Sequence, residues 1–166
     1  PTAIVGLSGV TGQVPHVSVG GNTVFVAYRN TSFFWQIVRY NLITTGLPPI
    51  FSGPAPVAGL STELEVFDLV ASPSGDAVFV VGESTGAGTI NGVSVPRFGS
   101  AEDPFAARLT PDGGVVWTRG FGGSAFEHAR GAALLDDQLI LVGICGGSGS
   151  ALCQNGTGSY VISVRP

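Results

Sequence analysis

The sequence predicts an all-β fold made of repeated antiparallel units, and three observations carry that prediction. The 166 residues include 26 Gly and 11 Pro, which punctuate short runs rich in Val, Ile and Phe. Three of these runs share one form and start at positions 24, 78 and 139, a spacing of 54 and then 61 residues. No long stretch has the hydrophobic period of an amphipathic helix. A period near 50 residues is typical of stacked supersecondary units.

Each of these runs is the second strand of a predicted hairpin. The turns fall at 20–22, 74–76 and 136–137, where Gly, Asn, Ser and Asp suit turn backbone angles. The strands before the turns are 16–19, 67–71 and 131–135. A third type of strand follows at 36–40, 105–109 and 160–164, and a fourth at 115–120 and, more weakly, at 49–51. An Asn-Gly pair at 91–92 predicts a further small hairpin.

The third unit reaches the end of the chain without a fourth strand, and the N-terminus is predicted to supply it. Residues 4–12 align without a gap with residues 115–123, and both stretches end in Gly-x-x-Gly. Such pairing hides strand edges that otherwise invite aggregation. Four antiparallel strands form one blade of a β-propeller. We therefore predict a single domain over 1–166, with blade equivalents at about 14–54, 66–121 and 130–166 plus 2–8.

The best-defined stretch runs over 89–123 and continues into 130–143. Its pattern is Asp103, Phe105, Ala107-Arg108-Leu109, Asp112-Gly113, Trp117, Gly122-Gly123 and Val142-Gly143. This pattern resembles the bacterial propeller repeats called SBBP repeats, although Arg108 stands where that family usually has Lys. The first unit departs from it at 33–35 and 48–49. The resemblance implies secreted or surface-exposed bacterial proteins with binding or scaffolding roles, and no shared catalytic residues.

The composition excludes two classes of function. A net charge of −4 argues against nucleic-acid binding, which needs clustered cations. The chain contains no run of 18 apolar residues, so no membrane span is predicted. Charged residues make up only 11% of the chain, which predicts exposed apolar surface and hence a partner interface. The chain starts with Pro and contains no Met, as expected of a processed product whose signal peptide has been removed.

Cys145 and Cys153 bracket a glycine-rich spacer that lets them approach bonding distance. We expect a disulfide, which would contribute about 2–3 kcal/mol and indicate an extracellular protein. Two buried free thiols are the alternative.

An aromatic cluster is the first candidate for binding. It consists of Phe33, Phe34 and Trp35, with Tyr28 and Tyr40 nearby in sequence. Aromatic platforms suit sugars and protein hot spots. Packing between blades is the alternative explanation for these side chains.

The second candidate is a group of loop residues. His16 and His128 each follow a Gly-x-x-Gly exit. Glu65 and Asp68 occupy the similar loop of the middle unit, and Glu127 adjoins His128. If these loops gather at one mouth of a ring, the group could bind a metal or act as acid and base. Solvated residues that anchor turns are the alternative. Calcium at Asp112 or at Asp136-Asp137 is a weaker possibility, because turn formation explains those residues better.

These observations favour a non-enzymatic extracellular propeller module for protein interaction, adhesion or surface assembly. Its expected partners are itself or other protein subunits, since propellers typically use 4–8 blades. Two chains could close a six-bladed ring, or the chain could be one piece of a longer protein or assembly. A carbohydrate- or small-ligand-binding, lectin-like propeller is one alternative, and a propeller hydrolase or lyase is another. We predict no catalytic residues, no metal site and no cofactor.

Overall fold

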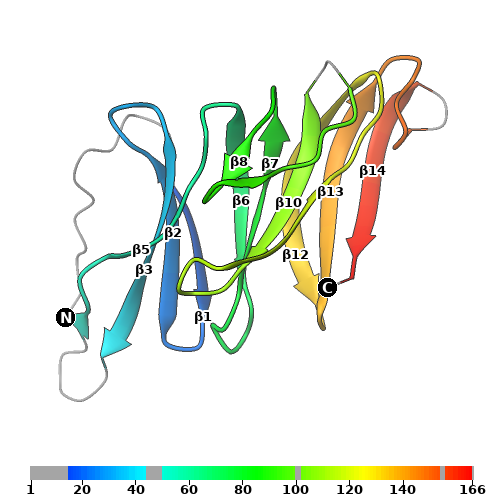
Figure 1. Cartoon of the computed structure of the whole chain (residues 1–166). Helices are drawn as coiled ribbons and strands as arrows, with labels where there is room; N and C mark the ends of the chain where they lie inside the picture. The colour runs from blue at the N-terminus through cyan, green and yellow to red at the C-terminus, as the bar shows by residue number, and fades with distance from the viewer. Residues whose placement is uncertain (1–14, 44–49, 100–101, 154–155, 166) are drawn as a thin grey trace.

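The computed structural model describes residues 15–43, 50–99, 102–153 and 156–165 (Figure 1). These residues form fourteen strands and no helix, and every paired strand is antiparallel. The predicted all-β antiparallel fold is therefore confirmed. None of the residues described forms a helix long and apolar enough to cross a membrane.

The first sheet contains five strands. β1 (His16–Gly20), β2 (Thr23–Arg29) and β3 (Trp35–Ile43) follow one another as a meander, and β3 then pairs with both β4 (Ile50–Phe51) and β5 (Ala55–Gly59). β4 lies within the predicted fourth strand at 49–51. β5 was not predicted, because Pro54 and Pro56 resemble loop punctuation. Pro56 lies where β3 and β5 change register.

The second sheet has the order β11-β10-β7-β6, and the third has the order β12-β13-β14. Their strands are β6 (Leu64–Ala71), β7 (Val78–Ser84), β10 (Asp103–Leu109), β11 (Val115–Gly120), β12 (Phe126–Leu135), β13 (Gln138–Gly146) and β14 (Thr157–Val164). The predicted Asn-Gly hairpin is confirmed as β8 (Thr89–Ile90) and β9 (Val93–Ser94), with positive φ at both Asn91 and Gly92. The N-terminal strand expected at 2–8 lies outside the described residues.

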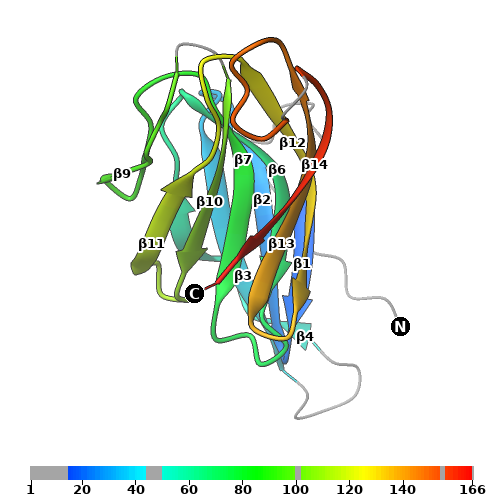
Figure 2. The same cartoon turned by 90° about the vertical axis from the view of Figure 1, so that its right-hand side faces the viewer.

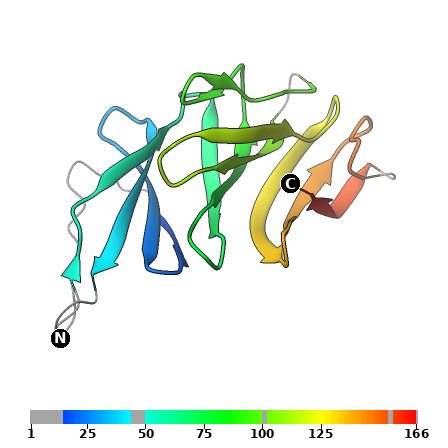
Figure 3. The same ribbon diagram turned by 60° about the horizontal axis from the view of Figure 1, so that its bottom comes forward.

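The three sheets stand face to face in chain order (Figures 1 and 2). Figure 3 shows the succession from below, with the blue and cyan first sheet, the green second sheet, and the yellow to red third sheet. Apolar residues of the first two sheets form one core, and those of the second and third form another. Within the described ranges the sheets close no ring, so the propeller arrangement remains a prediction.

Side chains of one sheet also bind the backbone of the next. Ser18 Oγ on β1 accepts a hydrogen bond from the Ala71 amide on β6 at 2.8 Å, and Asp68 Oδ2 on β6 accepts one from the Ala132 amide on β12 at 2.9 Å. These bonds satisfy backbone donors that lie outside the ladders of their own sheets. They hold the first strands of successive sheets side by side.

Cys145 and Cys153 form the predicted disulfide, with Cα atoms 6.1 Å apart. The bridge packs with Tyr160 and Leu152 in a small cluster between β13 and β14. It therefore closes the loop that joins the last two strands of the third sheet.

Candidate functional site

The structure separates the members of the aromatic cluster. Trp35 is only 2% exposed and belongs to the core between the first two sheets, where the His16 ring lies 5.7 Å away. Tyr28 is half-buried on β2, and Phe34 is exposed at the β2–β3 turn beside Phe33. The indole of Trp35 is thus core packing, and Phe33 and Phe34 are the aromatic rings that this turn exposes.

The predicted loop group also divides, because each member has its own partner. His16 packs by Trp35, and Asp68 accepts hydrogen bonds from the amides of Leu69 and Ala132. His128 places Nδ1 2.9 Å from Glu83 Oε1 on β7. Glu83 was not singled out from the sequence, since it reads there as an ordinary strand residue.

The Glu83–His128 pair repeats a contact of the first junction. Arg29 on β2 forms an ion pair with Glu65 on β6 at 3.5 Å. Arg29 and Glu83 are both the sixth residue of the second strand counted from Val24 and Val78, and Glu65 and His128 take matching places in their hairpin registers. The two junctions therefore use one position for a contact between a carboxylate and a basic side chain, with the carboxylate on β6 in the first junction and on β7 in the second. This repetition indicates a role in fastening sheets together.

Burial dominates the electrostatics at the second junction. Burial raises the pKa of Glu83, while His128 and Arg130 act in the opposite direction. Burial, followed by the nearby carboxylates of Glu83 and Glu127, raises the pKa of Tyr160, so its hydroxyl stays neutral. The hydroxyl oxygen of Tyr160 is buried and forms no hydrogen bond. A neutral phenol with no base bonded to it is poorly suited to proton transfer.

Two further carboxylates are fully buried near the start of β10 and β12. Asp103 Oδ2 accepts hydrogen bonds from the amides of Phe98 and Gly99 at 2.9 and 3.0 Å, and Glu127 Oε2 accepts one from Gly123 at 3.3 Å. Gly122 has a φ of +139°, and a Cβ there would collide with Asp103 Oδ1. The Asp and Gly-Gly positions of the repeat pattern thus support each other: the carboxylate anchors one loop and the glycine makes room for it.

Two of the three acidic residues considered for calcium, Asp112 and Asp136, have other roles. Asp112 pairs with Arg39 at 2.8 Å, and Asp136 occupies the β12–β13 turn with a positive φ of 52°. Across the described part of the chain, no group of three or more His, Cys, Asp or Glu residues is arranged to hold a metal ion.

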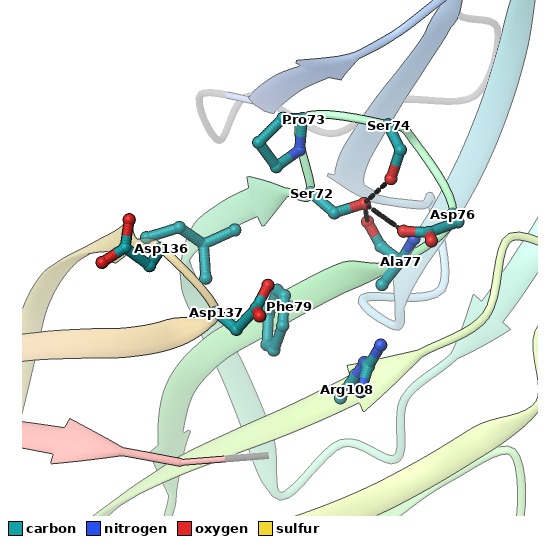
Figure 4. Close-up of a pocket in the computed structure, with 10 residues that line it drawn as sticks. Ser72, Pro73, Ser74, Asp76, Ala77, Phe79, Arg108, Asp136 and Asp137 are labelled. Atoms are coloured by element: carbon teal, nitrogen blue, oxygen red, sulfur yellow. Dashed lines mark hydrogen bonds between the residues drawn. The ribbon is translucent and has the colours of Figure 1, made fainter.

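A pocket of about 360 Å³ lies between the β6–β7 turn and the β12–β13 turn (Figure 4). Ser72 Oγ donates a hydrogen bond to Asp76 Oδ1 at 2.7 Å, and hydroxyl donors hold the pKa of Asp76 below its usual value. Arg108 lies with its guanidinium 5.9 Å from the centre of the Phe79 ring, and its buried Nε forms no hydrogen bond. The pocket therefore presents a guanidinium donor and carboxylate acceptors, Asp76 and Asp137, to one space.

The outer face of the third sheet leaves several large apolar side chains exposed. β13 and β14 place apolar side chains there, and these are exposed at Val142, Ile144 and Val161. Leu135 on β12 extends the same face. Exposed apolar patches of this kind mark interaction surfaces.

No family model matches the chain, and no curated protein matches it either. The resemblance to SBBP repeats accordingly remains a prediction that rests on the residues quoted above.

Proposed function

We propose that the chain is a non-enzymatic, propeller-type module that binds protein through the outer face of its third sheet. One comparison carries the proposal. The cross-strand pairs Ala27–Ile37 and Val81–Ala106 face the following sheet and are 0% exposed. The equivalent pair on the third sheet, Val142–Val161, is 41% and 72% exposed. A surface that is buried twice within the chain and left open the third time is expected to bind a partner.

The ion-pair geometry supports a non-enzymatic module. Glu83 and His128 are the residues an acid–base mechanism would use, yet their contact repeats the Arg29–Glu65 contact of the first junction. A position that serves both junctions is explained by packing. We therefore assign no catalytic residues.

The disulfide supports placing the module outside the cytosol. Such bridges persist in oxidising compartments and are rare where glutathione and thioredoxin keep thiols reduced. Together with the repeat resemblance, the Cys145–Cys153 bridge favours secretion to a bacterial surface.

Dye binding and light scattering test the proposed interaction face. We expect the wild-type chain either to associate or, when diluted to monomer, to bind the apolar dye ANS. Val161→Glu removes both properties while leaving the free energy of unfolding within about 0.5 kcal/mol, since the residue is exposed. Val116→Glu is the matched control, because Val116 is 51% exposed on β11, outside this face. A wild-type chain that neither associates nor binds ANS contradicts the proposed function.

A second candidate function is the binding of a small polyhydroxylated ligand, such as a sugar, in the pocket of Figure 4. Adjacent hydroxyls can donate to Asp76 and Asp137 and accept from Arg108. Ligand-detected NMR with a panel of monosaccharides tests this, with Arg108→Gln expected to abolish the signal. Arg119→Gln, on the neighbouring strand β11, is the control. Silence from the folded wild-type protein toward every sugar rejects this function.

A further inference from the structure

The interior junctions of the chain are built by one rule. In each, the second and third strands of one sheet present a face to the following sheet, which receives it on the opposite side of its own strands. Phe25, Ala27 and Ile37 of the first sheet meet Val80 and other residues of the second in this way. Phe79, Val81 and Ala106 of the second sheet meet residues of the third in the same way. The rule gives every sheet a donor face and an acceptor face.

The acceptor face of the first sheet is open along β1, at the far end of the chain, whereas Val26, Val38 and Tyr40 of β2 and β3 on the same face are buried. On the second sheet, Leu69 and Ala71 of β6 lie on the acceptor face and are 4% and 8% exposed. Val17 and Val19 of β1 take the same places in the hairpin register and are 59% and 62% exposed. The chain thus carries an open donor face on the third sheet and an acceptor strand, β1, that is left open on the first sheet.

We propose that the partner of the third sheet is the first sheet of a second copy of this chain. This inference rests on the proposed interaction function. Two copies related by a two-fold axis make the contact twice, so that both donor faces and both acceptor faces are covered. The result is a closed dimer of six sheets, within the 4–8 blades that propellers use. Each contact joins two different faces, and the two-fold axis repeats it, so that donor residues of each copy meet acceptor residues of the other.

The head-to-tail arrangement predicts that two variants, each defective alone, can associate with each other. Val17→Glu blocks only the acceptor face, and Val161→Glu blocks only the donor face. Each homodimer then contains two junctions with a buried unpaired carboxylate, so each variant alone is expected to be monomeric, with association weakened about 100-fold or more. A mixture of the two can pair the intact donor face of the Val17→Glu chain with the intact acceptor face of the Val161→Glu chain. This mixed dimer has one junction without a substitution, and both introduced glutamates lie in its second junction.

Size-exclusion chromatography with light scattering reads out the result. We expect wild type and the Val116→Glu control to have twice the chain mass of 16.8 kDa. The separate variants should have the mass of one chain, and their equimolar mixture should recover the dimer. Both substituted valines are exposed in the single chain, so circular dichroism should be unchanged.

Four results overturn the proposal. If Val17→Glu alone remains a dimer, the contact joins two third sheets instead. If the mixture stays monomeric, the two faces are not mates. If the wild type is a monomer whose Val161 face still binds ANS, the face serves another protein, and the proposed function survives without self-pairing. A monomer that binds no ANS removes both.

Discussion

The second and third sheets share a meander of antiparallel strands, yet only the second has a neighbour on each face. Its central strand β7 is buried along its whole length, from Val78 to Ser84. The corresponding strand β13 alternates between buried and exposed residues, with Leu139 and Leu141 inside and Val142 outside. The difference arises from position in the stack, because both strands are apolar on both sides.

The apolar residues of a strand therefore predict how much of it is buried in the complete assembly. Comparing the two sheets shows which strand is less buried than its sequence predicts. A strand with apolar residues on both faces is predicted to be buried on both faces. β13 has that pattern and has a cover on one side only. The same difference distinguishes β1 from β6 at the other end of the stack. This mismatch is the physical basis for assigning the terminal sheets an assembly role.

The largest predicted effect comes from placing one charge at equivalent positions of the two strands. Val81→Glu buries an unpaired carboxylate between the second and third sheets and should destabilise the fold by more than about 4 kcal/mol or prevent folding. Val142→Glu, on the partly exposed face, should change the free energy of unfolding by less than about 1 kcal/mol when measured on the monomer. Urea titrations followed by circular dichroism make the comparison. Equal losses would mean that the third sheet is covered within the chain.

Much of the strand layout was predictable because turn chemistry is local. The hairpins at 20–22, 74–76 and 136–137 and the Asn91-Gly92 turn all appear where Gly, Asn and Asp permit the required backbone angles. The disulfide was predictable because a short glycine-rich spacer holds its two cysteines together in sequence. Each of these features depends on a few neighbouring residues.

The contacts between sheets were not predictable, because they join residues far apart in sequence. Nothing local links Glu83 to His128, 45 positions later, or tells whether Trp35 packs inward or stands exposed. β5 was not predicted because prolines in and beside it are typical of loops. A sequence signal for Glu83 did exist. When the second strands of the hairpins are aligned, Glu83 takes the same position as Arg29, so two of the three strands have a charged residue there.

The disulfide gives the next largest effect and sharpens the contrast between sheets. It lies in the third sheet, which is the one with an open donor face, and the second sheet has no such bridge. Cys145→Ser with Cys153→Ser should lower the free energy of unfolding by about 2–3 kcal/mol. Calorimetry of the oxidised, reduced and double-variant proteins measures the loss. A reduced wild type that unfolds at the same temperature as the oxidised protein would contradict a stabilising role.

The smallest effect compares the ion pairs of the two junctions through pH. Because folding raises the pKa of Glu83 above its ordinary value of 4.5, the folded state holds this proton more tightly than the unfolded state. The stability contributed by the protonated group is complete below the ordinary value and is lost as pH rises through the folded one. Glu83→Gln removes this decline, so the difference in stability between variant and wild type should shift in favour of the variant as pH rises above the ordinary value of 4.5. Glu65→Gln, at the more exposed pair of the first junction, should cost less than about 1 kcal/mol. Urea midpoints measured across this pH range distinguish the two variants. Parallel pH profiles for Glu83→Gln and wild type would show that His128 and Arg130 offset the effect of burial on the pKa of Glu83.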